Sequence, residues 1–354
     1  MATIIPASQV RQLYTQASID VYQQRLRAPS LLRGLFPAVY TGTKYASIDI
    51  ERIGEDVAVD IERGTEGNRN KFSLSTQKIF EPPYYAEYYD VTQEAIYDQV
   101  LGAAAGNGVT PELLAQFTSS VANRMGVLQD KIERAIELMC VSILETGKVT
   151  LKDGNVIDFK RKSASIVNPG AGNYWANNVD LYTQLDAAGN FIRSKGKTSD
   201  DTFNIIMGAS AFAKMRENTV FKGRQDTVNM KLDNVMGPMR TDNSGGVFHG
   251  TISSDNYRFQ LWTYPQFYKN TSGVDTAYLN DKLVTIVPTT PRFKTAFCAV
   301  PQLVQPGGGV AQQGPYVIDN KRDEWNTTDL MRIRCAPLPI PTAIDTIYTL
   351  RAVE

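Results

Sequence analysis

Residues 111–146 read PELLAQFTSSVANRMGVLQDKIERAIELMCVSILET, and this stretch decides the fold. Thr110 is a fair N-cap, Pro111 suits the first helical position, and Gly147 suits the position after the last turn. These 36 residues would form a helix about 54 Å long at ~1.5 Å per residue, whereas an average helix has about 11–12 residues. We therefore predict one unusually long helix, with apolar residues at steps of three and four: Leu113, Leu114, Phe117, Val121, Met125, Leu128, Ile132, Ile136, Met139, Ile143 and Leu144.

The polar side of this predicted helix carries Asp130 and Arg134, which are spaced i,i+4. Gly126 is a candidate position for a bend or a close approach. A strand of a coiled coil is the competing interpretation. The apolar set is wider than a bare a/d seam, and strand signals follow directly, so we favour a helix packed on sheets.

On the N-terminal side, residues 46–80 alternate between apolar and polar side chains on both sides of a turn at Gly54-Glu55-Asp56. A second irregular tip at residues 64–68 leads into another alternating run, residues 71–80. Period two around glycine turns predicts a long β-hairpin. Because an isolated hairpin is marginally stable in water, we expect this one to lie on something else, such as a neighbouring copy.

Residues 1–45 form a first unit. Apolar residues from Val10 to Val21 recur at helical spacing, and Pro29, Gly34 and Pro37 then interrupt the pattern. Five basic residues stand against one acidic residue in this unit. It is interpreted as a solvated arm, with contact to an acidic partner as the alternative.

Four tyrosines, Tyr84, Tyr85, Tyr88 and Tyr89, follow Pro82-Pro83. They could resemble a platform on which nucleic-acid bases stack. No lysine or arginine lies between them, although single-strand binders combine such platforms with basic side chains. We therefore interpret these tyrosines as packing or interface residues.

The C-terminal half predicts helices and strands in mixed order, which favours the α+β class. A hairpin with its turn at Asp153-Gly154 follows the long helix. We expect the segments Tyr257–Tyr264 and Leu283–Val287 to be two strands joined by a long polar hairpin loop around Asn270–Gly273, and we expect a loop-rich stretch at residues 222–250. The predicted helices are Asp180–Arg193 and a segment from Gly208-Ala209-Ser210 to Asn218, and the predicted strands are Phe203–Met207, Tyr257–Tyr264, Leu283–Val287, Asp329–Cys335 and Thr346–Val353.

Composition bounds the class of protein. The 354 residues are 42% hydrophobic and 21% charged, as in an ordinary folded protein, and 37 basic residues balance 37 acidic ones. A dedicated nucleic-acid binder usually has a basic excess, and a near-neutral surface favours self-association. Cys140, Cys298 and Cys335 are far apart and without a CxxC pair, so neither zinc nor a disulfide framework is expected. We expect no signal peptide and no membrane-spanning segment.

No pattern of catalytic residues stands out. The single histidine, His249, would be the one possible base of a Ser-His-Asp or Cys-His arrangement, and we interpret it as structural. The sequence has no Gly-x-Ser-x-Gly elbow, no HExxH, no EF-hand loop and no phosphate-binding glycine loop. A glycosidase-type pair of catalytic carboxylates is not excluded by the sequence, but no two acidic residues stand out as such a pair. We therefore assign no catalytic, cofactor-binding or metal-binding residues, and no cofactor.

The order of segments resembles the phage coat fold of the Hong Kong 97 type (HK97-like), and the local sequences resemble the lambda-type major capsid family, major capsid protein E. The resemblance covers nearly the whole chain. It is carried by Ser163–Lys195 with its Asn168-Pro169-Gly170-Ala171-Gly172-Asn173-Tyr174-Trp175, by Asn204–Glu217, by Phe259–Val287, and by a tail with Trp325 and Cys335-Ala336-Pro337-Leu338-Pro339.

The resemblance implies a structural subunit that assembles into pentamers and hexamers of an icosahedral head around double-stranded DNA. It implies a virion location and assembly in the bacterial cytoplasm. Scaffold, portal and a decoration protein would be partners, and DNA would be contacted weakly. The implied domains are an N-terminal arm (1–45), an extended loop (46–80), a peripheral domain (81–189) with its spine helix (111–146), an axial domain (190–320) and return strands (321–354).

Three points stay open at this stage. Some relatives of this fold form a Lys–Asn isopeptide between subunits, and no residues can be assigned to that chemistry here. An encapsulin-like cargo shell would have the same fold. A cytosolic enzyme with an unrecognised carboxylate site is the alternative from another class.

Overall fold

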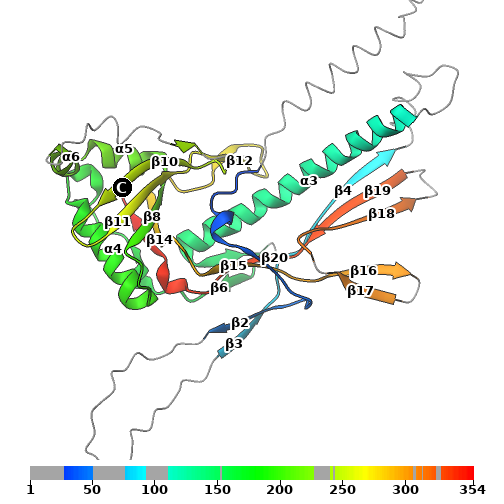
Figure 1. Ribbon diagram of the computed structural model, residues 1–354, viewed down its shortest axis with the longest axis horizontal. Coiled ribbons are helices and arrows are strands. Elements are labelled where there is room, and N and C mark those ends of the chain that lie inside the picture. The colour runs from blue at the N-terminus through cyan, green and yellow to red at the C-terminus, as the bar shows by residue number, and fades with distance from the viewer. Residues whose placement is uncertain are drawn as a thin grey trace, which may run out of the picture.

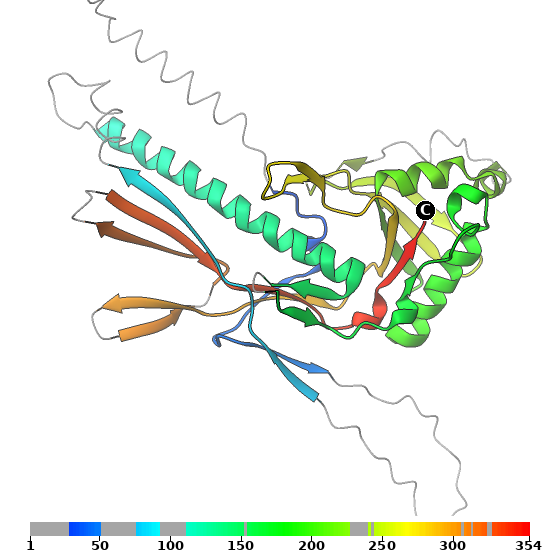
Figure 2. The same cartoon turned by 180° about the vertical axis from the view of Figure 1, so that it is seen from behind.

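A computed structural model describes residues 28–50, 76–92, 111–151, 154–226, 240–241, 244–305, 308–312, 314–323 and 328–354 of the chain. Figures 1 and 2 show two parts, which we call the long body and the lobe. The long body consists of one long helix and small sheets beside it. The lobe consists of a larger sheet with three shorter helices, and the C-terminus lies there.

Helix α3 (Pro111–Thr146) is the axis of the long body and has the bounds that the sequence predicts. Gly147 follows it with φ +72°, and its N–H donates to the carbonyl of Ile143 at 2.9 Å. Thr110 and the apolar residues before Ala122 lie outside the part whose side chains the structure describes. The buried apolar face includes Met125, Ile132, Ile136, Met139, Cys140, Ile143 and Leu144.

Two predictions about the faces of α3 need correction. Leu128 is only half-buried at the margin of the core. Asp130, predicted on the polar side, is buried. The reason is that α3 is covered on a second side. Asp130, Glu133 and Glu137 share one stripe of the helix by their spacing, and the 3-10 turn η1 (Arg33–Leu35) contacts α3 there, through Arg33.

Small sheets flank α3 along the long body (Figures 1 and 2). One has three antiparallel strands in the order β18-β19-β4, and another has the order β1-β15-β20, with β1 parallel to β15. Three two-stranded ribbons complete this part: β2–β3, β5–β6 and β16–β17. The bounds are β1 (Ala38–Tyr40), β2 (Ala46–Ile50), β3 (Thr76–Phe80), β4 (Tyr85–Thr92), β5 (Lys148–Thr150), β6 (Val156–Asp158), β15 (Phe293–Phe297), β16 (Val300–Gln305), β17 (Gly308–Gln312), β18 (Val317–Asp323), β19 (Thr328–Cys335) and β20 (Pro337–Pro341).

The lobe is built on a mixed seven-stranded sheet in the order β7-β21-β14-β8-β11-β10-β9. Its central strand β8 runs parallel to β11 and antiparallel to β14. The strands are β7 (Ile166–Val167), β8 (Thr202–Met207), β9 (Arg240–Thr241), β10 (Val247–Ser253), β11 (Arg258–Thr263), β14 (Leu283–Pro288) and β21 (Tyr348–Arg351), and the helices are α4 (Leu181–Gly196), α5 (Ala209–Glu217) and α6 (Thr219–Asp226) with the 3-10 turns η2 (Ser163–Ser165), η3 (Trp175–Asn177) and η4 (Ile344–Thr346).

Strand β8 lies where the two hydrophobic cores meet. Phe203, Ile205 and Met207 pack with the apolar side of α4 and with α5. Ile206 points to the other face and belongs to the core that includes α3. A strand with both faces covered is expected to be apolar throughout, as this one is in its second half. The lobe and the long body are therefore joined through shared core packing as well as through the backbone.

Helix α4 shows why the local predictions succeed. Asp180 caps it, because its carboxylate accepts from the N–H of Tyr182 at 3.1 Å. Leu181, Leu185 and Ala188 are buried on one face, as predicted. The helix continues to Gly196, beyond the predicted Arg193.

The pairing of two predicted strands differs from expectation. β11 and β14 are strands, but they are not partners, because β8 lies between them. The polar loop at residues 270–273 is the tip of a separate small hairpin, β12 (Phe267–Lys269) with β13 (Asp275–Ala277). The stretch at residues 222–250, predicted to be loop-rich, contains the end of α6 and the start of β10 in its described part.

The sheet of the lobe and the predicted axial domain, residues 190–320, have different bounds. The lobe takes strands from residues 166–167, 202–288 and 348–351. β21 returns to pair with β14, whereas the strands between Pro288 and β21, β15 to β20, join the long body. The division of the chain into domains with separate roles stays a prediction.

Candidate functional site

The residues that could carry chemistry are dispersed. Within the described ranges, no group of three or more histidine, cysteine, aspartate or glutamate side chains could hold a metal ion. His249 is buried, its Nε2 lies 2.8 Å from Thr263 Oγ1, and its ring lies 4.1 Å from that of Phe212. This environment fits the structural role predicted for it. Among the helices that the structure describes, none is long and apolar enough to cross a membrane.

The three cysteines are buried and none is in a disulfide. Burial raises the pKa of the Cys140 thiol and that of the Cys335 thiol well above their ordinary value, and it also raises the pKa of Cys298. Because the thiolate is the nucleophilic form, these thiols are poor nucleophiles at neutral pH. They act as small apolar side chains, as predicted.

The first buried polar site lies in the C-terminal third of α3, around Glu137. This side chain is fully buried and accepts three hydrogen bonds. The N–H of Leu32 donates to Oε1 at 2.9 Å, the N–H of Arg33 donates to Oε2 at 2.9 Å, and the Tyr264 hydroxyl donates to Oε1 at 2.7 Å. Burial raises the pKa of Glu137, and these hydrogen bonds and the charge of Arg33 oppose that effect.

Residues 30–33, near the start of the described chain, are thus tied to both parts of the molecule. Arg33 forms an ion pair with Glu133 of α3 at 3.0 Å. The N–H groups of Ser30 and Leu31 donate to the carbonyl of Ser244, just before β10, at 2.9 and 3.1 Å. Together with the hydrogen bonds to Glu137, these contacts fix residues 30–33 against α3 and the lobe.

The second buried polar site is at the C-terminal end of α3, where Arg161 joins three segments. Its Nη1 donates to the carbonyl of Leu144 at 2.8 Å, and its Nη2 donates to the carbonyl of Ile347 at 3.1 Å and to Thr349 Oγ1 at 2.8 Å. Its Nε donates to Ser165 Oγ at 2.8 Å. Burial lowers the pKa of Arg161 to about 10, so the side chain stays charged at neutral pH. Arg161 thereby satisfies carbonyls that the helix end leaves open.

Three of the four tyrosines noted in the sequence lie on β4, on both of its faces, and Tyr84 directly precedes this strand. Tyr85 points to α3, where its hydroxyl lies 3.8 Å from Met139 Sδ, and Arg124 of α3 bonds the hydroxyl of Tyr89. Packing is therefore confirmed for these two. Tyr84 and Tyr88 lie on the opposite side and are exposed. An exposed aromatic pair is typical of an interface.

Two arginines share a carboxylate on this exposed face. Arg332 donates to Asp319 from Nε at 3.2 Å and from Nη2 at 2.6 Å, and Arg334 lies 2.9 Å from the same carboxylate. The hydrogen bond from Arg332 and the charges of both arginines lower the pKa of Asp319. This contact fixes β18 to β19, so the surface with Tyr84 and Tyr88 is rigidly supported.

One ribbon leads away from the rest of the molecule. β2 and β3 pair from Ala46↔Phe80 to Ile50↔Thr76 and lead away from the long body (Figure 1). No further strand pairs with this ribbon among the residues that the structure describes. Residues 51–75, the rest of the predicted hairpin, lie outside the described residues.

The sequence did not predict the two buried polar sites, around Glu137 and Arg161, or the carboxylate of Asp319 that two arginines share. Glu137 and Leu32 are 105 residues apart, and Arg161 and Thr349 are 188 residues apart. One usable signal was present: Asp130, Glu133 and Glu137 fall on one stripe of an otherwise well-patterned helix. A stripe of carboxylates on a long helix can indicate a solvated face or a second, polar contact, and the structure shows the second.

Residues 23–352, nearly the whole chain, match a family model described as phage major capsid protein E. A search of curated protein sequences found no match.

Solved structures share the fold at low sequence identity. A prophage protein of E. coli CFT073 described as a capsid protein aligns with TM-score 0.59 and 17% identity, over 96% of this chain and 98% of that one. A phage-related protein from Bordetella bronchiseptica RB50 aligns with TM-score 0.50 and 9% identity, over 99% and 98%. A chain of the mature capsid of bacteriophage PhiM1 aligns with TM-score 0.48 and 12% identity, over 93% and 88%. The predicted α+β coat fold is confirmed.

Proposed function

Because the chain belongs to the phage major capsid protein E family, we propose that its copies form pentamers and hexamers of an icosahedral phage head that encloses double-stranded DNA. The chain is a structural subunit of a self-assembling shell, and its place is the virion. Assembly in the cytoplasm of a bacterial host is part of the proposal. So is the absence of an enzymatic role.

The observation that carries the proposal is the ribbon β2–β3. It extends from the long body as two strands with no further partner within the described ranges. A two-stranded ribbon is marginally stable alone, and its outer edges carry unpaired backbone groups. Contact with a neighbouring copy would supply both the missing packing and the missing pairing. A subunit that must bind its neighbours in this way is suited to a closed shell.

We propose the following roles for the segments. Residues 1–45 are an arm, and residues 46–80 are an extended loop that lies across an adjacent subunit. Residues 81–189 with α3 form the peripheral domain, completed by the return strands at 321–354. Residues 190–320 supply the axial domain, which meets its copies around the five-fold and six-fold axes. The fixed root at residues 30–33 supports an arm that is held in one direction where it leaves the body.

The partners follow from the same role. Equal numbers of basic and acidic residues suit a lining that encloses DNA with weak contact, because phosphate contacts otherwise bind strongly at low salt. Scaffold, portal and a decoration protein are the other proposed partners. No observation in the described structure favours the encapsulin-like cargo shell or the cytosolic enzyme.

A ribbon-shortened variant tests the proposal. Residues 51–75 are replaced by Asn-Gly, so that Ile50 and Thr76 remain joined and β2 still pairs with β3. We expect a folded, soluble subunit that forms no closed shells in negative-stain microscopy. The matched control shortens another ribbon tip, residues 270–273 between β12 and β13, and should assemble normally. Closed shells of normal size from the 51–75 variant would refute the proposed role of the ribbon.

A further inference from the structure

Three lysines gather just after the end of α3, and we call them the lysine patch: Lys148, Lys160 and Lys162. Their side chains are 53%, 67% and 38% exposed. All three come from the ribbon β5–β6 or the residues directly after it.

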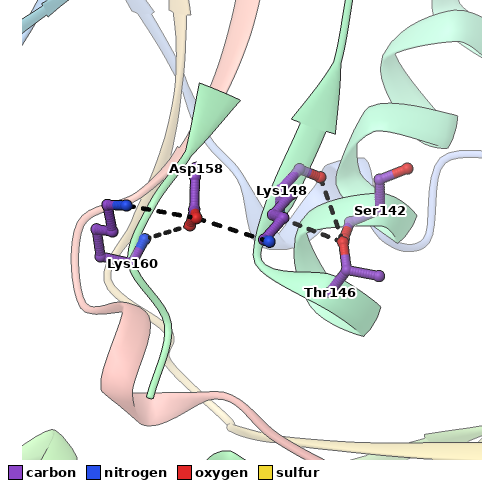
Figure 3. Close-up of polar contacts among 5 residues, drawn as sticks. All are labelled: Ser142, Thr146, Lys148, Asp158 and Lys160. Atoms are coloured by element: carbon purple, nitrogen blue, oxygen red, sulfur yellow. Dashed lines mark hydrogen bonds and ion pairs between the residues drawn. The ribbon is translucent and has the colours of Figure 1, made fainter. Parts of the chain in front are cut away.

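The acidic groups beside the lysine patch compensate it only in part. Figure 3 shows Lys148 and Lys160 reaching the same carboxylate, that of Asp158, and each Nζ lies 3.7 Å from Oδ2. The other oxygen of Asp158 accepts from the N–H of Lys160 at 2.8 Å. This backbone hydrogen bond, followed by the charges of the two lysines, lowers the pKa of Asp158. Lys162 pairs with Asp345 at 2.8 Å. One carboxylate for two exposed lysines leaves net positive charge at the surface.

The lysine patch stands on a rigid support. The N–H of Lys148 donates to Thr146 Oγ1 at 3.3 Å, and that hydroxyl donates to the carbonyl of Ser142 at 2.7 Å (Figure 3). Arg161, between Lys160 and Lys162, is anchored to α3 and β21. Lysines held on a fixed backbone lose less freedom when they bind than lysines on a loose loop would.

The same face of the ribbon also offers apolar contact and open edges. Val156, which lies two residues before Asp158 on β6, is 51% exposed. Thr150 lies opposite Val156 and is also exposed. Among the described strands, none pairs with the outer edge of β5 or of β6. The surface therefore fits an extended segment that carries both acidic and β-branched residues.

The chain itself contains such a segment. Residues 49–66 hold seven acidic residues and two basic ones, and Val57, Val59 and Ile61 alternate with polar or small residues there. This segment is continuous with β2, which leads away from the long body in both views (Figures 1 and 2). We propose that the lysine patch of one copy binds the acidic segment 49–66 of a neighbouring copy. The inference rests on the proposed function, because the segment reaches a neighbour only in an assembly.

Such a contact joins two different surfaces, so repetition of it around an axis closes a ring. Its electrostatic part also makes a prediction about salt. Pairs between exposed charges are screened at high ionic strength, where the Debye length falls to about 3 Å at 1 M salt. Assembly should therefore weaken as salt rises, even though the subunit carries no net charge.

A charge-swap experiment tests the pairing. The variant Lys148→Glu/Lys160→Glu reverses the patch, and Asp60→Lys/Glu62→Lys reverses part of the segment. Each double variant should raise the concentration needed for shell formation about tenfold, because attraction between exposed opposite charges becomes repulsion between like charges. A chain with all four substitutions should assemble at nearly the wild-type concentration. Light scattering against concentration and negative-stain microscopy measure both effects.

The control variant Lys222→Glu/Lys269→Glu makes the same charge change at exposed sites of the lobe and should assemble normally. Circular dichroism of unassembled subunits shows whether each variant is folded. Lys148, Lys160, Lys222 and Lys269 are exposed, so unfolding of their variants is not expected. If the Lys148→Glu/Lys160→Glu variant forms shells at the same concentration as the wild-type chain, the inference is overturned. Failure of the four-substitution chain also overturns it, and would assign the lysine patch to another anion such as DNA phosphate. If the wild-type chain forms no shells, the proposed function fails instead.

Discussion

Replacing Glu137 by alanine should destabilise the subunit strongly. The substitution removes the acceptor for the N–H groups of Leu32 and Arg33 and for the Tyr264 hydroxyl, all of which lie in a fully or partly buried site. A buried donor left without a partner costs about 1–3 kcal/mol. Three such donors, allowing for partial rehydration, give a loss of about 3–6 kcal/mol in the free energy of unfolding.

Urea-induced unfolding of unassembled subunits, followed by circular dichroism, measures this loss. Glu217→Ala, at an exposed position on α5, is the matched control and should leave the free energy of unfolding nearly unchanged. Hydrogen exchange adds a local readout, because the N–H groups of Leu32 and Arg33 should exchange faster in Glu137→Ala. If the alanine variant loses less than about 1 kcal/mol and residues 30–33 stay protected, the anchor is not the reason for their placement.

Glu137→Gln gives the pH dependence of the same site. Burial raises the folded-state pKa of Glu137 above its ordinary value of 4.5, so the folded protein binds a proton more tightly than the unfolded chain. The resulting stabilisation is fully present below pH 4.5 and is lost as the pH rises through the folded-state pKa. Glutamine does not titrate, so wild type should lose stability relative to Glu137→Gln across that window. An unchanged difference from pH 4 to pH 8 would contradict this.

Two further predictions concern α3 and the shared carboxylate. Ile136→Asp places a charge at a fully buried position and should lower the free energy of unfolding by about 4 kcal/mol or more. Leu128→Asp, at a half-buried position, should lower it by about 1–2 kcal/mol. Equal losses of stability in thermal unfolding would contradict this difference in burial along α3. Asp319→Asn should destabilise the subunit at pH 7, and the difference should vanish as the pH falls below 3.8, because the pKa of Asp319 is lowered in the folded state and its contribution is lost on protonation. Stability curves of both proteins between pH 2 and pH 7 check this.

Local patterns predicted the elements of this chain well. Residues Pro111–Thr146 form the helix that proline, glycine and the apolar spacing indicate, and Phe203–Met207 lies within β8. Helix ends and turns depend on residues close in sequence, so a single sequence contains the necessary information. The same holds for β5–β6, whose turn was visible at Asp153-Gly154.

Partners distant in sequence could not be predicted. β8 separates β11 from β14, and no local pattern states which strand lies between two others. Asp130 has the sequence pattern of an exposed residue, and its burial follows from the covering of α3 on a second side, where η1 contacts it. Glu137 and Arg161 have ordinary polar neighbours in sequence, and their roles come from segments 105 and 188 residues away. The charge and polarity of a side chain are read directly from the sequence, whereas its burial depends on segments that are distant in the sequence.

Stability and association are carried by different parts of this subunit. Two large cores meet at β8 and hold the lobe and the long body together. By contrast, the described strands form four two-stranded sheets, β2–β3, β5–β6, β12–β13 and β16–β17, each too small for a core of its own. Substitutions in the cores should therefore change folding without changing which surfaces meet, whereas substitutions on the ribbons β2–β3 and β5–β6 should change assembly at nearly constant subunit stability. Weak, separate contacts of the second kind also allow a misplaced subunit to dissociate before a shell closes, because each contact contributes only a little free energy.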